Sequence, residues 1–121
     1  MIVMVTGGRN YNDMSRMRDA LKDYDNVGTY LLQGGATGAD YLASRIWHKE
    51  FQNPYITHPA PWDRAGRAAG GMRNIAMLRG QSLAPHAKLT PDVVIAFPGG
   101  RGTAHARNTA KEYGIEVIEI S

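Results

Sequence analysis

The stretch VVIAFPGGRGTAHA, residues 93–106, joins a continuously apolar segment to a glycine loop and then to a helix-like segment. An apolar run that does not alternate with polar residues is typical of a parallel-sheet strand whose two faces are both covered by helices. Thr103 ends the glycine loop and is expected to be the N-cap of the helix that follows. The stretch therefore predicts a strand–loop–helix unit of an α/β fold.

Five short apolar segments predict strands along the chain. They cover residues 2–5, 29–32, 55–57, 93–97 and 115–120. The first and fourth are continuously apolar, which indicates central strands. The last one, IEVIEI, alternates between apolar and acidic residues, as a strand at the edge of a sheet would.

Helical patterns separate these strands, and we expect helices over about 13–24, 38–51, 67–80 and 103–113. Asp13 is the expected N-cap of the first helix, and Gly114 is expected to end the last one. The stretch 81–91 is expected to be a connecting loop. The alternation predicts a single domain over residues 1–121, a Rossmann-like three-layer αβα sandwich with a mostly parallel five-stranded sheet and right-handed crossovers.

The composition is that of a globular protein, with 43% hydrophobic and 21% charged residues. The absence of cysteine excludes disulfides, thiolate metal sites and cysteine nucleophiles. The four histidines show no metal-binding spacing, so we expect neither a metal site nor a cofactor. No apolar run is long enough to span a membrane, and we expect a cytoplasmic protein. The net charge of +3 favours anionic partners.

Glycine loops follow three of the expected strands directly: VTGGRNY (5–11), LQGGATGAD (32–40) and FPGGRGTAH (97–105). Without a Cβ the backbone can lie against a ligand and turn its N–H groups toward a phosphate. The N-terminus of a following helix adds unpaired N–H groups and a partial positive charge. Neither GxGxxG nor GxxxxGK[ST] occurs, so the chain carries neither a dinucleotide fingerprint nor a P-loop.

For a strand order of 3-2-1-4-5 the three loops would meet at the carboxyl edge of the sheet, where ligands bind in open α/β folds. Arg101 in the third loop is placed to pair with a phosphate or a carboxylate. The sequence therefore predicts a phosphate or nucleotide site. Its expected ligand-binding residues are Gly7, Gly8, Arg9, Gly34, Gly35, Gly38, Asp40, Trp62, Arg73, Asn74, Pro98, Gly99, Gly100, Arg101, Gly102 and Thr103.

Five segments together resemble the YspA-like branch of the SLOG superfamily, in the right order and over nearly the whole chain. They are GGRNY (7–11), GGATGAD (34–40), PWDRAGRAAGGMRNIAML (61–78), VVIAFPGGRGTAHA (93–106) and GIEVI (114–118). SLOG proteins include the Lonely Guy phosphoribohydrolases, the Rossmann domain of DNA-processing protein A, and sensor domains thought to bind nucleotide-derived signals such as relatives of ADP-ribose. The resemblance implies a Rossmann-like fold, a nucleotide ligand and a homodimer or higher homo-oligomer.

Lonely Guy enzymes carry PGGxGTxxE, whose glutamate helps to cleave an N-glycosidic bond. The resemblance aligns that loop with residues 98–103, the glutamate with Ala106 and a functional arginine with Arg73, which is followed here by Asn74. The phosphate loop and the arginine are present, whereas the acid is missing. An oxocarbenium-like transition state needs a nearby carboxylate and a group that handles the proton.

Three other residues are candidates for that chemistry. Asp40 is expected beside the crevice, where it would bind a ribose hydroxyl, act in catalysis or complement the helix dipole. Asp63 is a second acid, or a partner in a local ion pair. His105 follows the third loop and could act as an acid or base, as histidine does in many enzymes. Trp62 could stack on a base or pack in a core or an interface.

The sequence thus leads to one principal function and two alternatives. The principal one is binding of a nucleoside phosphate or ADP-ribose-like signal, as a sensor or as a protein of phage–bacterium conflict. The first alternative is a hydrolase that cleaves an N-glycosidic or phosphate bond with Asp40, Asp63 or His105. The second, binding of single-stranded nucleic acid, is the less favoured, because the chain lacks a basic stripe interleaved with aromatic residues.

Overall fold

The structure is a computed structural model that describes residues 1–60, 66–82 and 90–121. Its strands are β1 (Ile2–Thr6), β2 (Tyr30–Gln33), β3 (Tyr55–Thr57), β4 (Val93–Ala96) and β5 (Glu116–Glu119). Its α-helices are α1 (Met14–Leu21), α2 (Ala39–Arg45), α4 (Ala69–Leu78) and α5 (Arg101–Glu112). Short helical turns extend three of them: η1 (Lys22–Tyr24), η2 (Ile46–Glu50) and η3 (Gly66–Ala68).

The five strands form one parallel sheet in the order β3-β2-β1-β4-β5. This is the order expected from the sequence, with β1 and β4 inside the sheet and β5 at one edge. Every residue of β1 and β4 is buried, whereas β5 is only partly covered. The chain runs from β1 to β2 and β3 on one side of β1 and then returns through α4 to β4 on its other side, so the strand order reverses between β1 and β4. That reversal places a crevice at the carboxyl ends of these two strands.

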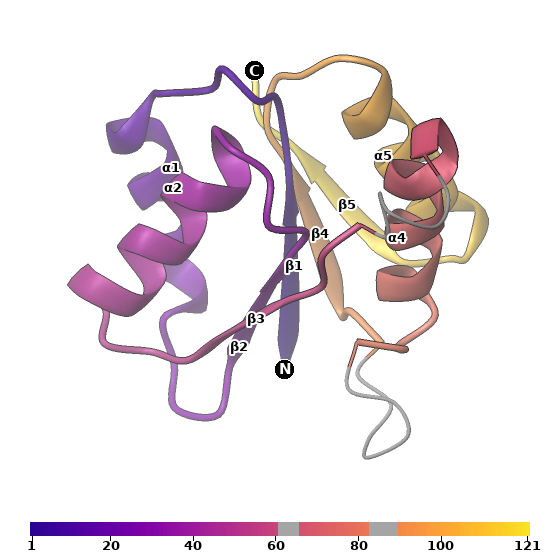
Figure 1. The fold of residues 1–121 in the computed structure, drawn as a ribbon. Helices are drawn as coiled ribbons and strands as arrows, with labels where there is room; N and C mark the ends of the chain where they lie inside the picture. The colour runs from indigo at the N-terminus through magenta and orange to yellow at the C-terminus, as the bar shows by residue number, and fades with distance from the viewer. Residues whose placement is uncertain (61–65, 83–89) are drawn as a thin grey trace.

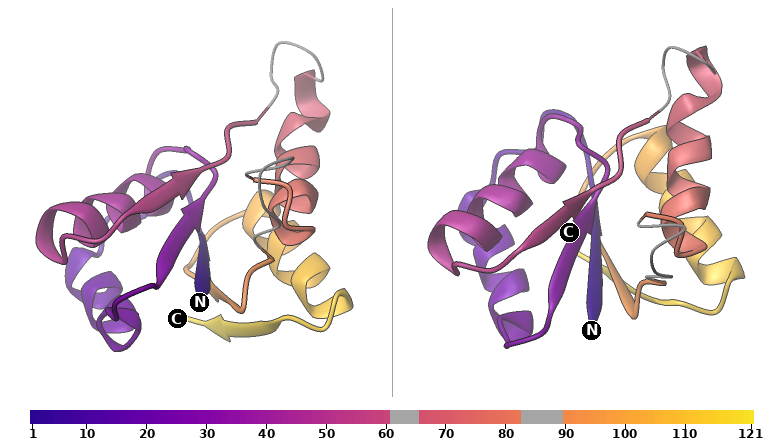
Figure 2. Two further views of the ribbon diagram at one scale, coloured as in Figure 1. Left: turned by 90° about the horizontal axis from the view of Figure 1, so that it is seen from below. Right: turned by 60° about the horizontal axis from the view of Figure 1, so that its bottom comes forward.

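Helices cover both faces of the sheet, with α1 and α2 on one side and α4 and α5 on the other (Figure 1). Figure 2 shows the same three layers from two further directions. Successive side chains of a strand point to opposite faces of the sheet, so the core consists of one cluster on each face. Val3 and Val5 belong to the cluster under α1 and α2, and Met4 belongs to the cluster under α4 and α5. The αβα sandwich predicted from the sequence is confirmed.

Two of the three predicted helix ends are found. Asp13 caps α1, since its Oδ1 accepts the backbone N–H of Arg16 at 3.1 Å. Gly114 has φ +73° and donates its N–H to the carbonyl of Lys111, while Ile115 donates to Ala110, which completes a Schellman motif after α5.

The third predicted helix end, the N-cap at Thr103, is wrong. The first helical hydrogen bond of α5 runs from the N–H of Ala104 to the carbonyl of Gly100, at 3.0 Å. The N-cap is therefore Gly100, and Thr103 lies inside the first turn, nearly buried. The two glycines before Thr103 concealed the earlier start, because glycine is uncommon inside helices.

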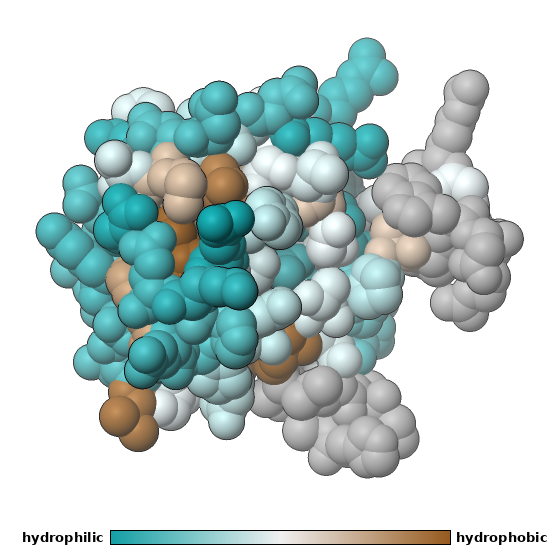
Figure 3. Space-filling view, turned by 60° about the vertical axis from the view of Figure 1, so that its left-hand side comes forward, coloured by the Kyte–Doolittle hydropathy of each residue, from teal (hydrophilic) through white to brown (hydrophobic). Residues whose placement is uncertain are grey.

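The outer side of the α1 and α2 layer is mostly hydrophilic (Figure 3). Ion pairs lie on this surface, among them Arg18 with Glu50 at 2.6 Å. None of the helices in the described ranges is both long and apolar enough to cross a bilayer.

Candidate functional site

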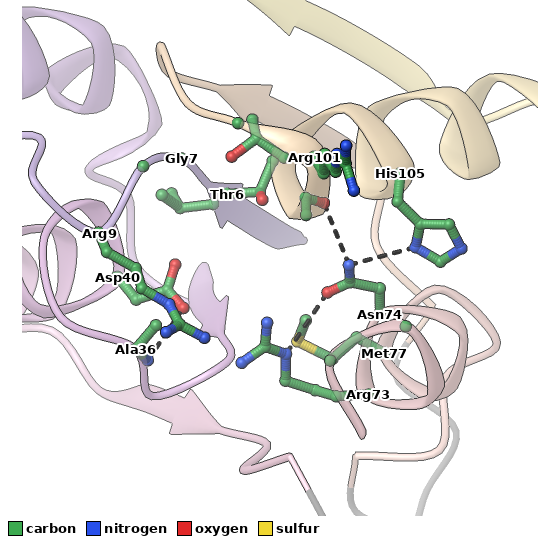
Figure 4. A pocket seen from close by; sticks show the side chains of 17 residues that line it. Thr6, Gly7, Arg9, Ala36, Asp40, Arg73, Asn74, Met77, Arg101 and His105 are labelled. Carbon is green, nitrogen blue, oxygen red and sulfur yellow. Dashed lines mark hydrogen bonds between the residues drawn. The ribbon is translucent and has the colours of Figure 1, made fainter. Parts of the chain in front are cut away.

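A cleft of about 450 Å³ opens at the carboxyl edge of the sheet, where the strand order reverses between β1 and β4. Loops after β1, β2 and β4 contribute to it, together with one side of α4 and the first turns of α5 (Figure 4). The three glycine loops therefore converge, as the sequence predicted. The charged side chains along the cleft are Arg9, Arg73, Arg101 and Asp40, so cations outnumber acids.

The N-terminus of α5 faces this cleft without a side-chain cap. Its N-cap is Gly100, which has no side chain to offer. The N–H groups of Arg101, Gly102 and Thr103 precede the first helical hydrogen bond, and no acceptor for them is recorded in the described part of the chain. Unpaired N–H groups and the positive end of the helix dipole together attract an anion.

The glycines of the three loops fall into two groups. Most are required by close packing. A Cβ on Gly7 would lie 2.5 Å from Cβ of Ala39, and one on Gly99 would lie 2.6 Å from the backbone nitrogen of Gly8. Gly38 has φ +73° and packs on the backbone of the first loop.

Gly100 and Gly102 form the second group. A Cβ on either would meet nothing within 4 Å, and neither has a left-handed backbone. Both line the cleft. The fold itself does not require glycine at these two positions, so the open space beside them is available to a ligand.

The second glycine loop differs from the third, because its N–H groups are already used. Asp40 Oδ2 accepts the N–H of Gly34 at 3.1 Å and that of Ala36 at 3.2 Å. The N–H of Gly35 is donated to the side-chain oxygen of Gln33. This loop is held in place by side chains and offers none of these three N–H groups to a phosphate.

Asp40 lines the cleft but is only 6% exposed. Burial raises the pKa of its carboxyl group. The N–H of Ala36, the charge of Arg73 and the N–H of Gly34 act in the opposite direction. The residue thus combines a structural role, closing the loop before α2, with a carboxylate beside the cleft. From the sequence, the structural alternative for Asp40 is an acid that complements the helix dipole. The structure shows in addition that the Asp40 carboxylate accepts two backbone hydrogen bonds from the loop.

Arg73 projects from α4 across the cleft toward the second loop. Its Nη1 donates to the carbonyl of Gly34 at 3.1 Å, and its Nε donates to Oδ1 of Asn74 at 3.4 Å. Burial lowers the pKa of the guanidinium, Asp40 raises it, and Arg9 lowers it further. The side chain remains a cation, since arginine does not lose its proton in proteins.

Asn74 is nearly buried and joins α4 to α5. Its Nδ2 donates to the carbonyl of Gly102 and contacts Nδ1 of His105, both at 3.3 Å. The partners fix the orientation of the Asn74 amide. Its nitrogen faces the Gly102 carbonyl, which can only accept, and its oxygen faces the Arg73 guanidinium, which can only donate. Nδ1 of His105 then faces a donor N–H group of Asn74.

His105 lines the cleft from the second turn of α5. Its Nδ1 side faces Asn74, and its other ring nitrogen points away from Asp40 and Arg73 (Figure 4). The nitrogen on the cleft side is therefore engaged by Asn74. This arrangement does not present a ring nitrogen to a reacting atom between Asp40 and Arg73.

Other predicted site residues lie around the main cleft. Gly34 and Gly35 line a neighbouring cavity of about 410 Å³, which shares Arg9, Ala36 and Arg73 with the main cleft. Pro98 and Gly99 border a surface hollow that residues 8–13 also line. Trp62 and Asp63 lie outside the described residues. Ala106, aligned with the Lonely Guy glutamate, has 0% exposure and belongs to the core under α4 and α5.

Sequence reasoning missed several cleft residues. They are Val5, Thr6, Ala36, Gly70, Gly71 and Met77. Thr6 is the last residue of β1 and directly precedes the first glycine loop, which is a signal that could have found it. Gly70 and Gly71 form a fourth double glycine, in the first turn of α4. Within the described ranges, no group of three or more histidine, aspartate or glutamate side chains could hold a metal ion.

Two solved structures share this fold. The X-ray structure of TM1055, a structural genomics target, superposes with a TM-score of 0.68 at 22% identity, over 96% of this chain and 71% of that one. The structure of the Moco carrier protein from Chlamydomonas reinhardtii gives a TM-score of 0.64 at 18% identity, over 98% of this chain and 75% of that one.

Two sequence comparisons are more specific. The chain is 37% identical to the Gene 61 protein of Mycobacterium phage D29 over 127 aligned positions, which cover 98% of this chain and 94% of the relative. Residues 1–64 match the family model described as the YspA, cpYpsA-related SLOG family. The resemblance noted in the glycine loops is therefore confirmed, and the chain belongs to the YspA, cpYpsA-related SLOG family.

Proposed function

We propose that this protein binds a nucleotide-derived small molecule in the main cleft, with a phosphate of the ligand at the N-terminus of α5. The observation that carries the proposal is the pair Gly100 and Gly102. No protein atom within 4 Å requires either glycine, both line the cleft, and both stand beside N–H groups without recorded acceptors in the described chain. A phosphate needs such an approach to the backbone.

Charge supports the same assignment. Arg101 begins α5, and Arg73 reaches the cleft from α4. Charge-assisted hydrogen bonds from arginine to phosphate are among the stronger polar interactions in proteins. Asp40 stands across the cleft from α5 and is suited to accept hydrogen bonds from the hydroxyl groups of a ribose.

The comparisons support a small-molecule ligand without identifying it. One protein of the same fold is named a Moco carrier protein. The relative from a phage supports the hypothesis that this chain captures a nucleotide signal in conflict between phage and host.

The test is calorimetry with AMP, ADP-ribose and adenosine. We expect AMP or ADP-ribose to bind and adenosine, which lacks a phosphate, to bind far more weakly. Equal affinity for AMP and adenosine would show that the phosphate does not reach the α5 N-terminus. Mass spectrometry of the same mixtures reports both retained ligand and released product.

A hydrolase is the second candidate, and the position of Asp40 beside the cleft favours it. In this role Asp40 would stabilise positive charge on a ribose or activate water. Its Oδ2 already accepts two backbone N–H groups, and Nδ1 of His105 is engaged by Asn74. These contacts suit a binding site better than a catalytic pair.

A further inference from the structure

Gly34 follows β2 directly and was predicted to contact the ligand through its backbone. Its backbone is not left-handed, so conformation does not explain the glycine. Its N–H is donated to Asp40 Oδ2 at 3.1 Å, and its carbonyl accepts Nη1 of Arg73 at 3.1 Å. Its N–H is therefore not available to a phosphate, and another reason must account for the missing side chain.

The space above Gly34 is filled by Arg73. A Cβ at this position would lie 2.6 Å from Nε and 2.7 Å from both Cδ and Cζ of Arg73. Real Cβ atoms do not approach other heavy atoms so closely, so one of the two groups would have to move. The nearest atoms are all at the far end of a flexible side chain, and a methyl group would therefore displace the guanidinium and leave the backbone in place.

We propose that Gly34 is a positioning residue for Arg73: because it has no side chain, it lets the guanidinium lie across the β2–α2 loop and bind the anionic group of the ligand there. The inference rests on the proposed function and deepens it. Gly34 acts on the ligand through Arg73 and makes no contact with the ligand itself.

Gly34 matters to ligand binding because of where the Arg73 side chain lies. The side chain lines both the main cleft and the neighbouring cavity, and so stands at their boundary. Gly34 O and Asn74 Oδ1 hold two of its nitrogens, and the charge of Asp40 attracts it. A guanidinium that is already ordered loses less conformational entropy when the ligand binds.

The first arm of the experiment needs no ligand. The ¹⁵Nε–¹Hε NMR resonance of Arg73 is identified by its loss in Arg73→Lys and is then followed in Gly34→Ala. We expect it to move to the range of exposed arginines while the backbone spectrum stays folded. Gly100→Ala adds a methyl group to the same cleft away from Arg73, and should leave that resonance unchanged. An unchanged Arg73 resonance in Gly34→Ala would overturn the proposal.

The second arm is a double-mutant cycle on AMP and ADP-ribose affinity, measured by calorimetry. We expect Gly34→Ala and Arg73→Ala each to weaken binding by about 10- to 150-fold, the range for a hydrogen bond to a charged group. The double variant should bind no more weakly than Arg73→Ala. If the affinity losses of the two single variants multiplied in the double variant, the proposal would be overturned, since Gly34 would then act independently of Arg73.

Folding is controlled within the same cycle. Because the three atoms nearest to the added methyl group all belong to Arg73, the thermal midpoint of Gly34→Ala/Arg73→Ala should equal that of Arg73→Ala. A much lower midpoint would contradict the inference, as the methyl group would then collide with the fold. If wild-type protein binds neither AMP nor ADP-ribose, the proposed function fails, while the NMR arm and the midpoints still decide whether Gly34 positions Arg73.

Discussion

Gly100 is the residue at which the demands of a ligand separate from those of the fold. A Cβ there would meet no protein atom within 4 Å, and the residue lines the cleft in which we propose that a phosphate binds. We expect Gly100→Val to abolish AMP binding in calorimetry while changing the free energy of unfolding by only about 0.5 kcal/mol, as for other substitutions without new contacts. Undiminished affinity would place the phosphate elsewhere.

Gly99, the preceding residue, provides the opposite control. A Cβ there would collide with the side chain of Thr103 and lie 2.6 Å from the backbone nitrogen of Gly8. Gly99→Ala should therefore lower the thermal midpoint clearly, in contrast to Gly100→Val. The two adjacent glycines look alike in the sequence, and only the contacts across loops distinguish them.

Asp40 allows a prediction about stability. Asp40→Asn keeps an oxygen that can accept the N–H groups of Gly34 and Ala36 and removes the buried charge, whereas Asp40→Ala leaves both N–H groups without their acceptor. In urea unfolding at pH 7 we expect Asp40→Asn to be at least as stable as wild type, and Asp40→Ala to lose about 1–3 kcal/mol.

The pH dependence of Asp40 has a definite sign. Because burial raises the pKa of the folded carboxyl above its ordinary value of 3.8, the folded state binds this proton more tightly than the unfolded state does. The associated stability is complete below 3.8 and is lost as the pH rises through the folded pKa. The advantage of Asp40→Asn over wild type should thus grow from pH 4 to pH 7. A shrinking advantage would mean that the ionised carboxylate is favoured by the fold.

At the scale of the element, α5 contains a conflict between stability and binding. Gly102 occupies its first turn, where a Cβ would meet nothing. Alanine is favoured over glycine within helices by up to about 1 kcal/mol. We expect Gly102→Ala to raise the free energy of unfolding and, because the methyl group faces the cleft, to weaken AMP binding.

A second variant of the same helix tests whether these two effects are separable. Ala104 is on α5 but not among the residues that line the cleft. Ala104→Gly should lower helix stability by a comparable amount and leave AMP affinity unchanged. If AMP affinity instead followed helix stability in both variants, the cleft-facing methyl group would not be the cause.

The elements themselves could largely be predicted from local pattern. The apolar runs marked all five strands, and Asp13 and Gly114 marked helix ends, because those signals depend on neighbouring residues. The reasons for individual glycines could not be predicted in this way. Gly34 is explained by Arg73, 39 positions away. Gly8 is explained by the third loop, since a Cβ there would lie 3.0 Å from the carbonyl oxygen of Pro98. Contacts of this kind exist only once the strand order brings the loops together.

At the scale of the whole molecule, the reversal of strand order between β1 and β4 unites groups that are remote in sequence. Asp40 from α2, Arg73 from α4 and the N–H groups of α5 line one cleft because parallel strands end at the same edge. The sequence predicted this convergence through the assumed order. It did not predict that the second loop satisfies its own N–H groups, because that depends on where the Asp40 and Gln33 side chains turn.

The same architecture leads to a prediction about turnover, namely that wild-type protein should bind AMP without releasing adenine. Asp40 is the one carboxylate among the cleft residues that the structure describes. Ala106, at the position of the Lonely Guy glutamate, is buried in the core, and Nδ1 of His105 is engaged by Asn74. General acid–base help contributes about 10²–10⁴-fold to such reactions. With a single, largely buried carboxylate and no second group placed to exchange the proton among the residues that the structure describes, glycosidic cleavage should be close to undetectable by mass spectrometry. Rapid release of adenine that disappears in Asp40→Asn, with AMP affinity retained, would move the protein from the binding class to the hydrolases and assign the chemistry to Asp40.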